Sequence, residues 1–125
     1  MAAAGSAQIT EEVYNSVKLI KWAWTSGTGQ TVLVDNTTEN FYTGKLLFMT
    51  SVPGAGGDAP TDNYDITILD KNSIDLLSDN GLNRATATTE SILETSLGAV
   101  ANSKLALNIA AAGSSNTGVC FLWIR

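Results

Sequence analysis

The sequence contains no histidine and only one cysteine, Cys120. Without histidine, the chain lacks the commonest general base and every nucleophile arrangement that pairs serine or cysteine with histidine. A single cysteine excludes an internal disulfide framework and any zinc site built from several cysteines. We therefore expect a protein that is not an enzyme and that has no metal site and no cofactor.

Positive charge is also scarce, because seven lysine and arginine residues stand against twelve aspartate and glutamate residues, for a net charge of −5. A net negative surface repels phosphate backbones, so we expect no nucleic-acid partner. The chain has no run of about 18 apolar residues, so we expect no membrane-spanning helix. The first eight residues carry neither a positive region nor an apolar run, so we expect no signal peptide.

Residues that favour strands and turns are abundant, because serine, threonine, glycine and asparagine make up more than a third of the chain. Residues 17–25 alternate, with Lys18, Ile20, Trp22 and Trp24 on one face of an expected strand. About seven or eight such short strands, separated by turns, are typical of a sandwich or barrel. The predicted fold is all-β, an antiparallel two-sheet sandwich of jelly-roll type.

The length of 125 residues predicts a single domain. Residues 1–10 are small and lack a hydrophobic pattern at their start, so we expect an extended N-terminal arm there and a β-sandwich domain over residues 11–125. Residues 53–63 are expected to form a long loop, and residues 85–97 fit a helical turn or a strand equally well. The other expected strands are 31–34, 45–52, 64–70, 74–77, 104–109 and 119–125.

Acidic residues are the first candidates for a chemical site. Acid–base catalysis needs two carboxyl groups about 5–10 Å apart in contrasting environments. Asp62 with Asp65, and Asp75 with Asp79, stand beside glycine, asparagine and serine, and we interpret them as turn-capping residues. An irregular calcium site formed by Asp58, Asp62 and Asp65 stays open. Cys120 lies in an apolar strand with no basic neighbour, so we expect a buried, unreactive thiol.

Large apolar residues are the stronger candidates. Trp22 and Trp24 share one strand face, which suits core packing, interface contacts or a platform that stacks on sugar rings. Residues 119–125 and 45–52 are apolar on both faces, more than a domain of this size can hide. We therefore expect oligomerisation or docking on a larger surface, through the predicted interface residues Trp22, Trp24, Phe48, Phe121 and Trp123.

Roughly residues 44–125 resemble small virion proteins of tailed bacteriophages. In the first half of this region the resemblance lies in the segment from Pro60 to Asp70, which contains Pro-Thr-Asp-Asn-Tyr-Asp-Ile-Thr. It continues in Ile74–Leu77, Asn83–Thr86, Lys104–Ile109 and the ending Gly118–Arg125. Such proteins resemble jelly-roll or related β-sandwich domains that cement or decorate the outside of the capsid.

The resemblance implies a cement or decoration protein on the outer capsid surface of the virion. Its partner would be the major capsid protein of the same phage, which it would bridge as a dimer or trimer and so stabilise the shell. Two alternatives stay open. One is a low-copy tail, adaptor or fibre component, and the other is a carbohydrate-binding β-sandwich module that uses Trp22 and Trp24.

Overall fold

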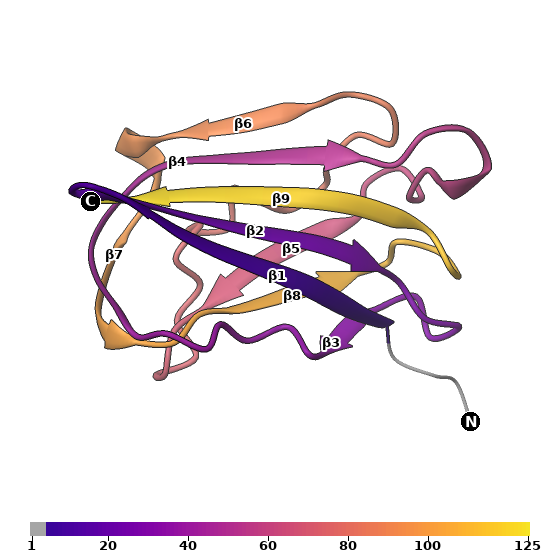
Figure 1. Ribbon diagram of the computed structural model, residues 1–125. Coiled ribbons are helices and arrows are strands. Elements are labelled where there is room, and N and C mark those ends of the chain that lie inside the picture. Colours follow the sequence, from indigo (N-terminus) through magenta and orange to yellow (C-terminus); the bar gives the residue numbers. More distant parts are fainter. Residues whose placement is uncertain (1–4) are drawn as a thin grey trace.

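The computed structural model describes residues 5–125, apart from the side chain of Leu33, and within them the chain is built almost entirely of β-strands (Figure 1). Two short 3-10 helices, Gly56–Asp58 and Glu94–Ser96, lie in connections. The strands are β1 Gly5–Tyr14, β2 Val17–Thr25, β3 Val32–Val34, β4 Tyr42–Pro53, β5 Asp65–Leu69, β6 Glu90–Leu93, β7 Ala99–Ser103, β8 Ala106–Ala110 and β9 Thr117–Ile124.

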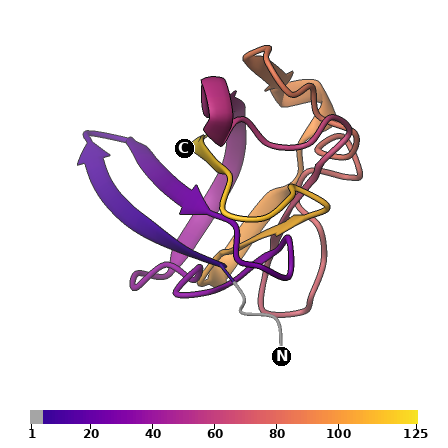
Figure 2. The same cartoon turned by 90° about the vertical axis from the view of Figure 1, so that its right-hand side faces the viewer.

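The strands follow one hydrogen-bonded path that folds into two layers. The order along the path is β5-β8-β3-β1-β2-β9-β4-β6, and β7 pairs with β4 beside it. The larger layer contains β1, β2, β9, β4 and β6, and the smaller layer contains β5, β8 and β3 (Figures 1 and 2). Every strand pair is antiparallel except the short pair between β1 and β3, which is parallel.

This arrangement confirms the predicted all-β sandwich. The jelly-roll part of the prediction is not confirmed, because β1 and β2 form a long hairpin and β1 also pairs with β3 in parallel. In residues 5–125 the structure contains no helix of the length and apolar character needed to cross a bilayer.

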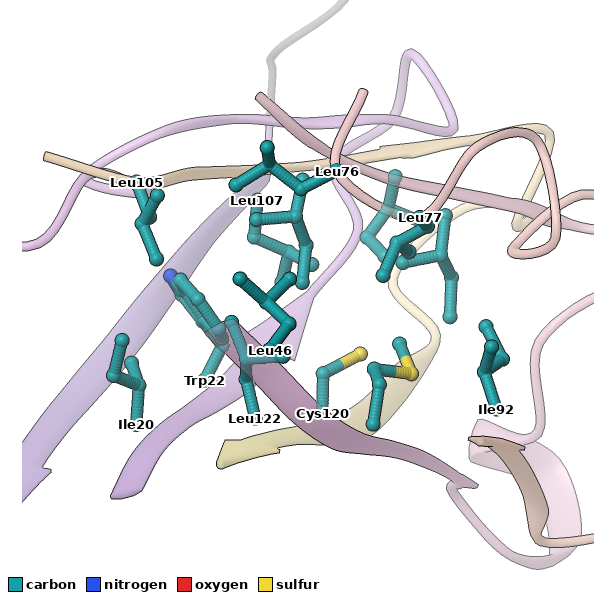
Figure 3. Packing of buried hydrophobic residues seen from close by; sticks show 14 of the residues in the cluster. Ile20, Trp22, Leu46, Leu76, Leu77, Ile92, Leu105, Leu107, Cys120 and Leu122 are labelled. Carbon is teal, nitrogen blue, oxygen red and sulfur yellow. The ribbon is translucent and has the colours of Figure 1, made fainter. Parts of the chain in front are cut away.

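The hydrophobic core lies between the two layers. Side chains from β2, β9 and β4 point towards side chains from β8 and the connection after β5, as Figure 3 shows for Trp22, Leu122 and Leu107. The alternation of buried and half-buried residues along β9 is complete, so one face of this strand belongs to the core. The large side chains that are fully buried include Ile20, Trp22, Trp24, Leu46, Met49, Tyr64, Ile66, Ile68, Leu77, Leu105, Leu107, Ile109, Leu122 and Ile124.

The expectation of an N-terminal arm over residues 1–10 is wrong for residues 5–10. These residues begin β1, and each residue from Ser6 onwards pairs with β2. Ala7 and Ile9 pack against the core, which is the apolar contact that holds the strand in place. The expected boundary between residues 10 and 11 therefore falls inside β1, while residues 1–4 lie outside the described part of the chain.

Three other differences concern short segments. Residues 74–77, expected as a strand, form turns with one isolated bridge, Leu69 to Asp75, because Asp75 caps the backbone there. The ambiguous stretch 85–97 contains the short strand β6 and a 3-10 helix. β7 was not expected, because three of its five residues are exposed and its sequence has little apolar alternation.

The structure places Gly5 at the start of β1, and a substitution there tests this placement. A methyl group at this position would lie 2.1 Å from the carbonyl oxygen of Thr25 and 2.5 Å from that of Thr31. We expect Gly5→Ala to lower the free energy of unfolding by about 1–3 kcal/mol, the usual cost of overpacking. Chemical denaturation measures the loss.

The control is Gly57→Ala, where a Cβ atom would meet nothing within 4 Å. This variant should unfold at the same denaturant concentration as the wild type, or slightly higher, because alanine restricts the unfolded chain. Equal stability of both variants would contradict the placement of Gly5 in the sheet.

Candidate functional site

The candidate site is the outer face of the larger layer, the face turned away from the core. We define this outer face by the residues of β2, β9 and β4 that alternate with buried ones. They are Leu19, Lys21, Ala23, Val119, Phe121, Trp123, Phe48, Thr50 and Val52. All except Lys21 are half-buried by their neighbours in the sheet. No strand or helix within residues 5–125 forms a further layer over this face.

Three aromatic rings form the centre of the outer face. The rings of Phe48 and Trp123 are 5.5 Å apart and tilted, and those of Phe121 and Trp123 are 5.8 Å apart and stacked. The ammonium group of Lys21 lies 5.8 Å from the centre of the Phe121 ring, within range of a cation–π contact. We call Phe48, Phe121 and Trp123 the aromatic cluster.

Pairing between strands places the cluster in an apolar row across four strands. Leu19 of β2 is opposite Trp123 of β9, Trp123 is opposite Phe48 of β4, and Phe48 is opposite Leu93 of β6. Leu93 is 63% exposed, so the apolar row remains uncovered as far as β6, the last strand of the larger layer. The next row contains Lys21, Phe121, Thr50 and Ser91, which adds polar groups beside the apolar ones.

A hollow of about 480 Å³ continues the outer face towards the other end of the strands. Its lining includes small residues such as Ala23, Gly54 and Gly118, together with Val52 and Val119. Gly118 is required for the packing beneath, because a Cβ atom there would lie 2.3 Å from the Trp24 ring. The outer face thus combines projecting rings with a recess, a shape that suits contact with another protein surface.

The structure separates the five predicted interface residues into two groups. Phe48, Phe121 and Trp123 come together on the outer face, whereas Trp22 and Trp24 are 0% and 1% exposed and belong to the core. The indole N–H of Trp22 donates to the backbone oxygen of Asn36 at 2.9 Å, and Trp24 packs on Tyr64 at 5.8 Å. The assignment of these two tryptophans to an interface or a sugar platform is corrected, because no partner reaches them.

Three of the acidic residues considered for a catalytic pair or a calcium site, Asp62, Asp65 and Asp75, accept backbone N–H groups. A carboxylate oxygen of Asp75 accepts the backbone N–H of Leu77 at 3.0 Å, and Asp65 accepts that of Asn83 at 3.0 Å. Asp62 accepts the N–H of Thr86 at 3.2 Å. Within residues 5–125 no group of three or more histidine, cysteine, aspartate or glutamate residues is placed to hold a metal ion.

Cys120 is confirmed as a buried thiol. Its side chain is fully covered by the core between the layers. Burial raises its pKa to about 12, because an apolar surrounding disfavours the thiolate. The thiol form is therefore the one favoured at neutral pH.

Glu11 is a residue whose role was not predicted from the sequence. Its carboxylate accepts the backbone N–H groups of Glu39 at 2.9 Å and Asn40 at 3.2 Å, and the hydroxyl of Tyr42 at 2.6 Å. Partial burial raises the pKa of Glu11, but these hydrogen bonds outweigh it, so that the pKa lies below its ordinary value. Glu11 thus ties the connection before β4 to the projecting hairpin.

Comparisons of the chain with protein-family models, with curated proteins and with solved structures give no match. The outer face offers a half-buried aromatic cluster, an exposed leucine and a recess. Features of this kind suit binding by desolvation and packing.

The hydrogen bonds of Glu11 predict a pH-dependent contribution to stability. A carboxylate with a lowered pKa in the folded state stabilises the fold above its unfolded pKa, and this contribution is lost as the pH falls through the folded value. We expect Glu11→Gln to be less stable than the wild type at pH 7. The difference should shrink as the pH falls below about 4. Denaturant midpoints measured over this range test the effect.

Glu39→Gln is the matched control, because it removes the same charge from the same region while Glu39 contributes only its backbone N–H to the cluster. Its stability relative to the wild type should change much less between neutral and acidic pH. A difference between wild type and Glu11→Gln that persists unchanged to low pH would contradict the role of the Glu11 carboxylate.

Proposed function

We propose that the protein is a non-enzymatic attachment protein that binds a larger protein assembly through the outer face. On the resemblance of residues 44–125, this assembly is the capsid of a tailed bacteriophage and the partner is its major capsid protein. The protein then acts as a cement or decoration protein on the outside of the virion. Its task is mechanical, since it bridges neighbouring capsid proteins and stabilises the shell.

The observation that carries the proposal is the aromatic cluster on the outer face. Phenylalanine and tryptophan side chains contribute large apolar areas, and tryptophan is among the residues that dominate the energetics of protein interfaces. In this structure the rings of Phe48, Phe121 and Trp123 cover one another only in part. A flat apolar partner surface would complete their burial.

The charge distribution supports attachment to protein and not to DNA. The chain carries a net charge of −5, and on the outer face the cation Lys21 lies over an aromatic ring. A negatively charged protein is repelled by DNA, which fits a place on the outside of a shell that holds DNA inside. Repeated weak contacts on a shell also give firm attachment through high effective concentration.

The copy number of this chain in purified particles of its phage tests the proposal. A cement protein should be present in a simple ratio to the major capsid protein, because it follows the symmetry of the shell. A few copies per particle would favour the tail, adaptor or fibre alternative. Absence from particles would contradict a virion role and leave glycan binding through other residues to be tested.

Trp123→Ala tests the outer face directly. Removal of a central aromatic anchor typically costs about 2 kcal/mol or more, which is about a 30-fold loss of affinity. We expect at least this loss when the variant binds to particles stripped of the protein, measured by co-sedimentation. Circular dichroism and thermal unfolding establish that the variant is folded.

Phe41→Ala is the matched control, because Phe41 is 62% exposed and lies outside the outer face, where it contacts Lys104. This variant loses a phenyl ring and should bind like the wild type. Thr50→Glu adds a second test, because it places a charge opposite Phe121 without removing any core side chain. Unchanged binding of folded Trp123→Ala and Thr50→Glu would contradict attachment through the outer face.

A further inference from the structure

The long strand β1 forms an open edge of the larger layer. β1 pairs with β2 from Ser6 to Tyr14, but its pairing with β3 on the other side covers only Gly5 and Ser6. After β3 the connection to β4 contacts β1 through the Glu11 carboxylate, which accepts the N–H groups of Glu39 and Asn40, and a hollow of about 490 Å³ lies between β1 and this connection. Within residues 5–125 no strand pairs with the outer side of residues 8–14, and Figure 2 shows the hairpin projecting to one side.

Backbone groups of alternate residues point towards this open edge. The N–H of Gly5 donates to the oxygen of Thr31 at 2.9 Å, on the side away from β2. Because N–H and C=O groups change sides at each residue of a strand, those of Ala7, Ile9, Glu11 and Val13 point the same way. The bridge between Ser6 and Val34 engages the N–H of Ala7. The groups of Ile9, Glu11 and Val13 form a row of unpaired donors and acceptors, which is a template for another strand.

The hydrogen bonds between β4 and β9, on the other side of the layer, lead to the same conclusion about which residues of β1 point towards the open edge. The N–H of Gly54 donates to the oxygen of Thr117 at 2.8 Å, so the odd-numbered residues of β9 face β4. The even-numbered residues of β9 then face β2, and the residue pairing of β9 with β2 and of β2 with β1 carries this alternation across to β1. The even-numbered residues of β1 therefore bond to β2, and the odd-numbered ones from Ile9 to Val13 are left for a partner.

We propose that the partner is a second copy of this chain, whose β1 pairs antiparallel with β1 of the first around a twofold axis at Thr10. In this register Thr10 lies opposite Thr10 of the second copy, Ile9 opposite Glu11, Gln8 opposite Glu12, and Ala7 opposite Val13. The paired stretch is residues 7–13, and it ends where β3 occupies the edge.

The side chains of β1 select this register over its neighbours. In an antiparallel pair, directly opposed residues have their side chains on the same face of the sheet. An odd-numbered residue of one copy therefore lies opposite an odd-numbered residue of the other, and the twofold axis passes through a residue position and not between two residues. An axis at Glu11 or Glu12 places two carboxylates directly opposite each other, which is destabilising. An axis at Ile9 pairs only residues 7–11, because β3 blocks Ser6. The axis at Thr10 gives the longest pairing, opposes no like charges, and covers Val13, which is 71% exposed.

The dimer joins two of the larger layers into one continuous sheet. A twofold axis perpendicular to a sheet keeps the same face of both copies on the same side. Both aromatic clusters therefore face one way, and one dimer presents two docking faces to a single large surface. Binding at the first face raises the effective concentration for the second.

Cross-linking across the axis tests the pairing on the isolated protein. Opposed residues that do not exchange hydrogen bonds have Cα atoms about 4.5 Å apart, within the range of a disulfide. We expect Thr10→Cys to form a covalent dimer under mild oxidation, seen on a non-reducing gel. Cys120 does not interfere, because it is fully buried.

Gln8→Cys is the matched control, since in this register its partner residue is Glu12 and its own symmetry mate is about 13 Å away along the strand. It should stay monomeric on the gel, whereas a mixture of Gln8→Cys and Glu12→Cys proteins should cross-link. If Thr10→Cys cross-links no faster than Gln8→Cys, the proposed pairing is wrong.

Sedimentation equilibrium gives the second readout. The wild type should reach twice the chain mass of 13.1 kDa as concentration rises. Thr10→Asp should stay at the single-chain mass, because two carboxylates would meet across the axis, while within one chain the new carboxylate would oppose Lys21 favourably. A wild type that stays monomeric, or that forms trimers, overturns the inference. No capsid is present, so this result and that of the attachment tests are independent.

Discussion

The structure depends on one constraint: β9 is apolar on both faces, but a two-layer sandwich has only one interior. The even-numbered residues Cys120, Leu122 and Ile124 enter the core, where they meet Trp22 and Leu107 from the two layers. The odd-numbered residues Phe121 and Trp123 must then point outwards. Because β9 is central in its layer, neighbouring strands can shield these rings at their sides but cannot cover them from above.

The open edge of β1 arises from the way the larger layer ends. The layer continues to β1 as a projecting hairpin, and only Gly5 and Ser6 are paired by β3. Glu11 stabilises this geometry, because its carboxylate holds the following connection below the hairpin without filling the edge. A sheet with an uncovered apolar face and an unpaired border is suited to assembly with other chains.

The sequence predicted the fold class, and it placed Phe121 and Trp123 on one face of their strand, because alternation along a strand reports which residues share a face. It did not distinguish the two faces of Val17–Thr25, and Trp22 and Trp24 proved to be core because the smaller layer covers their side. β1 was missed in part because its inward residues, Ala7 and Glu11, are small or charged. The role of Glu11 depends on backbone N–H groups almost thirty residues away, and no local pattern reports such a contact.

We propose that the outer face is the surface through which the protein attaches to its partner. The most direct test is a cryo-electron microscopy map of the assembled particle at a resolution that shows side chains. We expect Phe48, Phe121 and Trp123 to be buried against the major capsid protein. A map in which the protein is attached through the opposite side, with Trp123 facing solvent, would contradict this proposal.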